Sequence, residues 1–235
     1  MNLKSFGCSF IFGSELSDER QHYYSKKSRM SVPSNLTWPA HLARHLNANY
    51  NCYARPGSGN LQIAEKVLSQ LATDAEDSLY VIGWTWIDRF DYTSSDETMY
   101  NNFWKTVMPI DEDATAKVYY KNLHSEYRDK LTNLMYMKLT IDSLLQKKYS
   151  FVMTYMDSLL FDTKWHTTPA IVDLQNYIRP YLTQFNETNF LEWSKKNKFP
   201  ITDIGHPLEQ AHQAAGDYII QSFDKKSTGA HCHPV

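Results

Sequence analysis

Four short runs that we predict as strands, separated by segments of helical periodicity, constrain the fold of this chain most strongly. The runs lie at residues 2–7, 49–53, 79–83 and 151–156, and the third has no polar side chain except a tyrosine hydroxyl, which is typical of a strand buried on both faces. Apolar residues at helical spacing occur at 38–46, 61–71, 119–146, 171–185, 190–196 and 208–223. Strands that alternate with helices pair in parallel, so the pattern predicts an α/β fold, a three-layer α/β/α sandwich with a central, mostly parallel sheet.

The length of 235 residues fits a single domain that includes the whole chain, 1–235. Within it we expect a long polar loop at 9–33, a helical insertion at about 92–148 and a flexible tail at 225–235. The tail contains a His-Cys-His run at 231–233. A structural zinc ion needs about four ligands, and no second cluster stands at metal spacing, so we expect no metal site there.

Composition argues against several classes of partner. The formal net charge is −2, which provides no basic field for nucleic acid or for an anionic membrane. No run is apolar for long enough to span a bilayer, no secretory signal peptide is evident, and the three cysteines have no framework spacing, so we expect a cytoplasmic protein. The 16 Tyr, 11 Phe and 6 Trp favour an aromatic core, although such rings also line carbohydrate sites. The sequence leaves the oligomeric state open.

Several candidate site residues follow predicted strands or lie in one short loop. Ser9, Gly57 and Thr85 come just after the first three predicted strands, and the carboxyl ends of parallel strands share one edge of a sheet, where ligands bind. Asp203 and His206 stand three residues apart near the C-terminus. A serine hydroxyl needs an imidazole to take its proton and a carboxylate to orient that imidazole. These residues therefore predict a Ser9–Asp203–His206 triad.

Four short motifs occur in the order found in a known family. Gly-Cys-Ser-Phe at 7–10, Arg-Pro-Gly-Ser-Gly-Asn at 55–60, Gly-Trp-Thr at 83–85 and Asp-x-x-His-Pro at 203–207 resemble the four blocks of the SGNH (GDSL-like) hydrolases. This version of the blocks resembles a divergent branch associated with bacteriophages and environmental bacteria. If the gene belongs to a phage, the expected location is the host cytoplasm or the virion.

The resemblance implies roles for the candidate residues. Ser9 would be the nucleophile, His206 the general base, and Asp203 the acid that orients the imidazole. The oxyanion donors would be the backbone N–H groups of Ser9 and Gly57 and a side chain of the third block. The family has an asparagine at that place, whereas this chain has Thr85, whose hydroxyl has a shorter reach.

Four nearby residues have competing interpretations. Asn60, three residues after Gly57, could supply the missing oxyanion donor instead of Thr85. Arg89, together with Asp91, could bind substrate or could fasten the third-block loop, which follows Gly-Trp-Thr at 83–85, by an ion pair. Cys8 adjoins Ser9 and could suggest a thiol nucleophile. We predict instead a small buried side chain, because adjacent residues leaving a strand point in different directions and cannot both face His206.

These inferences favour a cofactor-free, metal-independent hydrolase of carboxylic esters. The expected substrate is a small molecule or a carbohydrate that carries an acetyl or another short acyl group, a preference that rests on family analogy and aromatic content. Two alternatives stay open. One is an acyltransferase, in which an alcohol replaces water as the acceptor. The other is a catalytically weak or inactive binding or structural protein of the same fold, for example a phage component.

Overall fold

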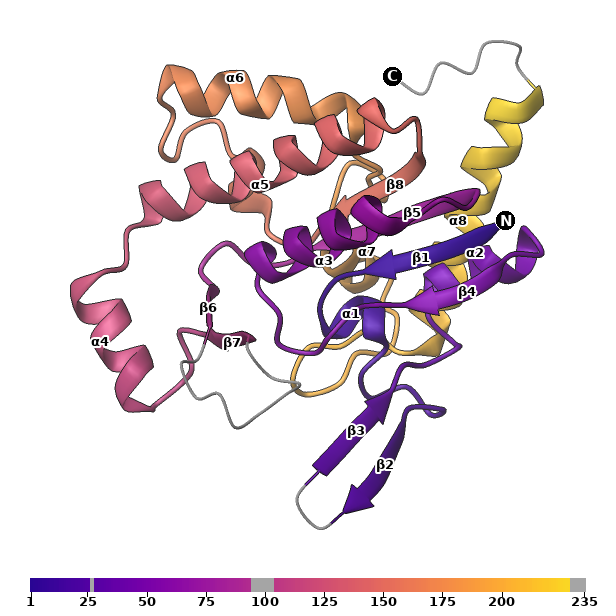
Figure 1. The fold of residues 1–235 in the computed structure, drawn as a ribbon, viewed down its shortest axis with the longest axis horizontal. Coiled ribbons are helices and arrows are strands. Elements are labelled where there is room, and N and C mark those ends of the chain that lie inside the picture. The colour runs from indigo at the N-terminus through magenta and orange to yellow at the C-terminus, as the bar shows by residue number, and fades with distance from the viewer. Residues whose placement is uncertain (26–27, 94–103, 229–235) are drawn as a thin grey trace.

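A four-stranded parallel sheet forms the centre of the computed structural model (Figure 1), which describes residues 1–25, 28–93 and 104–228. The spatial order of its strands is β4 (Asn49–Cys52), β1 (Asn2–Phe6), β5 (Ser78–Trp84) and β8 (Ser150–Tyr155). All three neighbouring pairs are parallel. The four predicted strands are confirmed, with shifts of one residue or so at their ends.

Helices cover both faces of this sheet, as the alternation of side chains along the strands requires. In β5, Leu79 and Val81 pack into one core cluster, whereas Tyr80 and Ile82 pack into the other. The helices α2 (Trp38–His45), α7 (Phe190–Lys196) and α8 (Glu209–Thr228) belong to the first cluster, and α3 (Asn60–Thr73), α5 (Glu126–Gln146) and α6 (Pro169–Ile178) to the second. The predicted three-layer α/β/α sandwich is therefore confirmed.

Several short elements complete the fold. They are α1 (Ser9–Phe12), the antiparallel pair β2 (Arg20–Ser25) and β3 (Ser28–Val32), the antiparallel pair β6 (Phe90–Thr93) and β7 (Trp104–Val107), α4 (Ala114–Asn122), and the 3₁₀ turns η1 (Ser158–Phe161) and η2 (Arg179–Tyr181). The segment at 9–33 thus differs from the expected loop, because it begins with a helical turn and continues as a hairpin.

The expected insertion at 92–148 is shorter than the sequence suggested. Leu134, Met137, Ile141 and Leu144 of α5 are fully or almost fully buried against the sheet, so α5 is one of the covering helices. Within the expected insertion, β6, β7 and α4 stand apart from the three layers (Figure 1). At the other end, α8 continues to Thr228 and includes the first residues of the expected tail. The His-Cys-His run at 231–233 lies outside the described residues.

Candidate active site

Ser9 is the first residue of α1 and follows β1 after a tight connection. That connection needs a glycine at position 7, because a Cβ there would lie 2.5 Å from the Ile11 side chain and 2.9 Å from the carbonyl oxygen of Gly83. The helical turn ends at Gly13, which has a φ of 82°, a left-handed conformation that favours glycine. The two glycines therefore allow the chain to turn directly under the serine at the carboxyl end of β1.

The structure brings His206 to Ser9. The distance from Ser9 Oγ to His206 Nε2 is 2.9 Å. The loop before α8 holds the histidine, since its backbone N–H donates to Thr202 Oγ1 at 3.1 Å and its carbonyl oxygen accepts from the Thr202 N–H at 2.9 Å. The ring of Phe10 contacts the imidazole edge-on, with 5.2 Å between centroids. Ser9 and His206 are therefore held by packing and by backbone hydrogen bonds, and Ser9 Oγ and His206 Nε2 are close enough for proton transfer.

The carboxylate beside this histidine is Glu15, not Asp203. His206 Nδ1 lies 2.7 Å from Glu15 Oε2, and the Thr202 hydroxyl donates to the same oxygen at 2.7 Å. Asp203 is exposed and has no hydrogen bond or ion pair to the described part of the chain. The reason is a turn in which the Gly205 N–H donates to the Thr202 carbonyl at 2.9 Å, so that Asp203 stands at the tip, in solvent. The expected position of Asp203 is corrected accordingly.

Glu15 has an unusual backbone conformation for its residue type. Its φ is 68°, in the left-handed region, where a non-glycine residue costs about 1–3 kcal/mol and where functional residues are enriched. Its N–H donates to Glu19 Oε2 at 2.7 Å. Hydrogen bonds from Thr202, and then from His206, lower the pKa of the Glu15 carboxyl below its ordinary value of 4.5. The group is therefore an anion over the neutral range and can hold the His206 Nδ1 proton.

The loop at 55–60, here called the second-block loop, presents Gly57. This glycine has a φ of 79°, and a Cβ on it would meet no atom within 4 Å, so its backbone faces open space. Among the described residues, neither the Gly57 N–H nor the Ser9 N–H donates a hydrogen bond within the chain. Both groups are therefore available to an external acceptor, as oxyanion donors must be.

The other two candidate oxyanion donors are placed differently. Thr85 is fully buried, and its hydroxyl has no hydrogen-bond partner in the described structure. The carboxamide of Asn60 bridges the backbone of Thr85, since Oδ1 accepts from the Thr85 N–H at 2.8 Å and Nδ2 donates to the Thr85 carbonyl at 3.1 Å. Asn60 therefore joins the start of α3 to the end of β5, and the Thr85 hydroxyl has no route to solvent.

Arg89 and Asp91 fasten the second-block loop rather than the third-block loop. Arg89 Nη1 donates to the Ser58 carbonyl at 3.0 Å, and its guanidinium carbon lies 4.8 Å from the centroid of the Trp86 ring. Asp91 accepts hydrogen bonds from α3 and its N-cap, and no ion pair joins it to Arg89 within the described residues. The structural interpretation of this pair is thus favoured, with the loop corrected.

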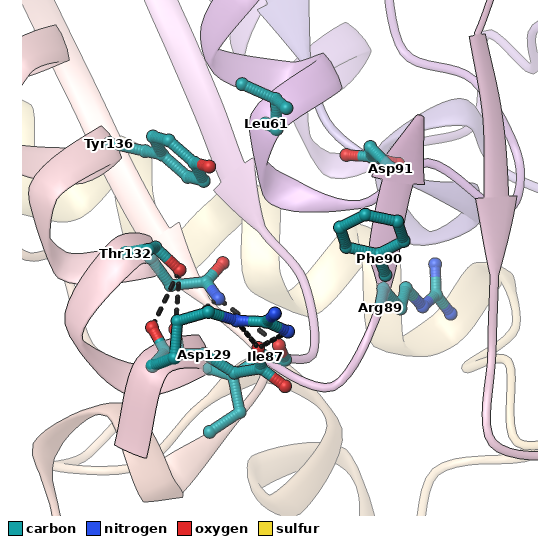
Figure 2. A pocket seen from close by; sticks show the side chains of 10 residues that line it. Leu61, Ile87, Arg89, Phe90, Asp91, Asp129, Thr132 and Tyr136 are labelled. Atoms are coloured by element: carbon teal, nitrogen blue, oxygen red, sulfur yellow. Dashed lines mark hydrogen bonds and ion pairs between the residues drawn. The ribbon is translucent and has the colours of Figure 1, made fainter. Parts of the chain in front are cut away.

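A pocket of about 150 Å³ lies next to this pair (Figure 2). In Figure 2, Phe90 and Asp91 of β6 lie on one side and Thr132 and Tyr136 of α5 on the other. Its lining residues are Leu61, Ile87, Arg89, Phe90, Asp91, Arg128, Asp129, Thr132, Asn133 and Tyr136. Ser9 and His206 are not among them, so the pocket is a neighbour of the Ser9–His206 pair and does not contain it.

Two other reactive side chains are buried away from solvent. Cys8 is only 1% exposed, in agreement with its expected role as a small buried residue. His212 on α8 accepts from the Trp38 N–H through Nδ1 at 3.2 Å, and complete burial lowers its pKa to about 3. A histidine that is neutral and enclosed in this way is a packing residue and not a second base.

Sequence reasoning missed Glu15 and Thr202. Glu15 lies in a polar segment without periodicity, and no spacing links it to a histidine 191 residues away. Thr202 directly precedes Asp203, but nothing in the sequence distinguishes its hydroxyl. Across residues 1–25, 28–93 and 104–228, no cluster of three or more His, Cys, Asp or Glu side chains could hold a metal ion. No helix in these ranges is both long enough and apolar enough to cross a membrane.

Comparisons with known proteins give matches at the level of structure alone. No family model matches the sequence, and no curated protein matches it. A member of the lipolytic G-D-S-L family from Veillonella parvula is similar at 12% identity and a TM-score of 0.50, over 95% of this chain and 98% of that one. An esterase from Pseudoalteromonas is similar at 10% identity and a TM-score of 0.50, over 97% and 100% of the two chains.

A third solved structure is an acetyl xylan esterase from Butyrivibrio proteoclasticus. It has 12% identity and a TM-score of 0.50, and the match covers 97% of this chain and 64% of that one. At such low identity these likenesses show the fold alone. The lipolytic G-D-S-L protein and the two esterases thus have the kind of fold that the four sequence motifs imply.

Proposed function

We propose that this protein is a serine hydrolase that cleaves carboxylic esters. The observation that carries the proposal is the chain of two short contacts, 2.9 Å from Ser9 Oγ to His206 Nε2 and 2.7 Å from His206 Nδ1 to Glu15 Oε2. A hydroxyl, an imidazole and a carboxylate in this order form the arrangement that activates a serine nucleophile. In this proposal Glu15 takes the role that the sequence motif suggested for Asp203.

The reaction would proceed in two halves through an acyl-enzyme. Ser9 Oγ attacks the ester carbonyl while His206 Nε2 takes the hydroxyl proton, and Glu15 stabilises the resulting imidazolium. The tetrahedral oxyanion accepts hydrogen bonds from the N–H groups of Ser9 and Gly57, each worth about 3–4 kcal/mol of transition-state stabilisation. The C–O bond to the alcohol then breaks, and His206 protonates the leaving oxygen. A water molecule, deprotonated by His206, releases the acid and restores Ser9.

For the substrate we propose a short acyl group, such as acetyl, on a carbohydrate or a similar alcohol. One support is the structural likeness to the acetyl xylan esterase from Butyrivibrio proteoclasticus, a protein named for removing acetyl groups from a carbohydrate. A second is the aromatic surrounding of the reacting pair. Phe10 contacts His206, and the half-buried Trp86 contacts Phe10 at 5.4 Å between centroids. Aromatic side chains give apolar contact to a sugar face.

Rapid-mixing kinetics with p-nitrophenyl acetate tests the proposal. We expect a burst of one p-nitrophenolate per active site followed by slower turnover, because an activated aryl ester acylates Ser9 faster than water hydrolyses the acyl-enzyme. Ser9→Ala should abolish both phases, and Cys8→Ala should keep them. The proposal is rejected if no p-nitrophenyl ester from two to eight carbons is turned over. It is equally rejected if Cys8→Ala, and not Ser9→Ala, removes the burst. A faster second phase on addition of a sugar alcohol, with acylated product, would identify an acyltransferase.

A second candidate is a binding protein of the same fold with weak chemistry, and Thr85 favours it. The third oxyanion donor is missing at this position, since the Thr85 hydroxyl is buried and unpartnered. Loss of one donor lowers kcat by about 10²- to 10³-fold. Under this candidate the protein would bind a carbohydrate with a Kd that Ser9→Ala leaves unchanged, and it would show no burst. Calorimetric titration with acetylated and deacetylated xylooligosaccharides separates the two candidates.

A further inference from the structure

The second-block loop is held from outside the sandwich by the β6–β7 pair. Arg55 Nη1 donates to the carbonyl of Trp104 in β7 at 3.1 Å, and Arg89, just before β6, donates to the carbonyl of Ser58. Asp91 in β6 accepts from the N–H of Gly59, the N-cap of α3. Three separate side-chain contacts thus join one short loop to one strand pair.

Asp91 makes the most extensive of these contacts. Its Oδ1 accepts from the Gly59 N–H at 2.9 Å and from the Thr106 hydroxyl at 2.5 Å, and its Oδ2 accepts from the Gln62 N–H at 2.8 Å. Asp91 is only 5% exposed. A carboxylate at this place binds the free N–H groups of the first turn of α3 and complements the helix dipole. Because a Cβ on Gly59 would lie 2.6 Å from Asp91 Oδ2, the approach requires glycine at position 59.

These contacts leave the backbone donor of Gly57 free among the described residues. The Arg55 N–H donates to the Gly7 carbonyl at 3.0 Å, and the Ser58 N–H donates to the Arg55 carbonyl at 3.2 Å. The Gly59 N–H is bound to Asp91, and residue 56 is a proline without an N–H. Gly57, with its positive φ and with open space at its Cα, keeps an unused N–H between fixed neighbours. Such a group is preorganised, since it needs no rearrangement when charge develops nearby.

We propose that Asp91 and Arg89 are positioning residues that hold the Gly57 N–H where it stabilises the oxyanion. This inference rests on the proposed hydrolase function and assigns a role to the β6–β7 pair. Neither side chain touches the reacting atoms in this account. Arg89 donates to the carbonyl oxygen of the Ser58–Gly59 peptide and Asp91 accepts from its N–H, so both side chains fix the same peptide group, and Asp91 also fixes the start of α3. A displacement of about 1 Å at a reacting centre costs about 10²-fold in rate, so the loss of either contact should be measurable.

The test compares Asp91→Asn with Asp129→Asn. The asparagine carboxamide keeps one acceptor oxygen, but its NH₂ group replaces the other carboxylate oxygen and faces a backbone N–H. One backbone hydrogen bond that Asp91 accepts is therefore lost. We expect kcat to fall about 10- to 100-fold, with KM within about 3-fold of wild type, because the donor acts mainly in the transition state. Affinity for a short-chain boronic acid should fall by the same factor, and the midpoint of the acid limb of kcat/KM should not move.

Asp129→Asn is the matched control. Asp129 lies across the same pocket on α5, is similarly buried at 6% exposed, and pairs with Arg128 and not with the second-block loop. Its kcat should stay within about 3-fold of wild type. If the two variants lose kcat equally, or if Asp91→Asn changes only KM, positioning by Asp91 is rejected. An inactive wild-type protein would reject the proposed function and this inference together, whereas an active one with unaltered Asp91→Asn kcat rejects the inference alone.

Arg89→Met keeps the inference testable if Asp91→Asn fails to fold. Arg89 is only half-buried, and methionine retains the apolar contact with Trp86 while it removes the bond to the Ser58 carbonyl. We expect kcat to fall about 3- to 10-fold with KM unchanged, since the N–H of the same Ser58–Gly59 peptide keeps its Asp91 contact. A rise in KM with unchanged kcat would overturn the positioning role and identify Arg89 as a substrate contact instead.

Discussion

Replacement of Glu15 by glutamine separates this account from the one that the Asp-x-x-His motif suggests. The carboxylate and the imidazolium that forms on proton transfer would have charge centres about 4 Å apart, where the attraction is about 1 kcal/mol in water and about 4 kcal/mol at an effective dielectric constant of 20. The Glu15 side chain is 39% exposed and that of His206 is 14% exposed, so an intermediate value of about 2–3 kcal/mol applies. Glu15→Gln should therefore lower kcat by about 30- to 150-fold.

The assay is steady-state hydrolysis of p-nitrophenyl acetate by wild type, Glu15→Gln and Asp203→Asn, with thermal melts to show that each variant is folded. Asp203 is exposed and makes no hydrogen bond or ion pair with the described residues, so Asp203→Asn should keep kcat within about 2-fold of wild type. The reverse pattern, in which Asp203→Asn loses activity and Glu15→Gln keeps it, would refute the assignment of Glu15. It would mean that the loop after Thr202 rearranges to bring Asp203 to the imidazole.

Three further predictions concern residues that support the site. Thr202→Val removes the hydroxyl that donates to the Glu15 carboxylate, and should lower kcat by about 3- to 10-fold; an unchanged kcat would contradict that support. Gly59→Ala places a Cβ against the Asp91 carboxylate and should cost about 1–3 kcal/mol in urea unfolding, and a neutral effect would show that the contact is looser. Burial lowers the pKa of His212 to about 3, whereas the unfolded chain binds the proton near pH 6.5. The contribution of His212 to the free energy of unfolding should therefore fall by about 1.4 kcal/mol per pH unit as pH drops from 6.5 toward 3, and His212→Gln should show a flatter dependence; parallel slopes would refute this.

The sheet and its covering helices were predictable because periodicity reports burial. The strand at 79–83 is apolar on both faces because helices cover both, and side chains along β5 alternate between two cores. The extent of the insertion was not predictable, because helical periodicity does not tell which element the apolar face of a helix packs against. The segment at 119–146 has helical periodicity whether its apolar face meets the sheet or another element, and only the fold shows that Leu134 and Ile141 pack against the sheet.

The candidate site was predictable in part. Ser9 and His206 come together because one follows a parallel strand and the other precedes the last helix, at the same edge of the sheet. The carboxylate was not predictable, because a four-residue helix and a left-handed Glu15 leave no periodic signal. Sequence spacing placed Asp203 near His206 along the chain, but the turn that ends at Gly205 directs it to solvent.

The central claim is that Ser9 is an activated nucleophile, and labelling by a fluorophosphonate measures this directly. Wild-type protein should form a covalent adduct that peptide mass spectrometry assigns to Ser9, and Asp203→Asn should label at a similar rate. His206→Ala should label at least about 10²-fold more slowly, since a serine without a general base is a poor nucleophile at neutral pH. The absence of an adduct in folded wild-type protein, or an adduct on a residue other than Ser9, would contradict the account.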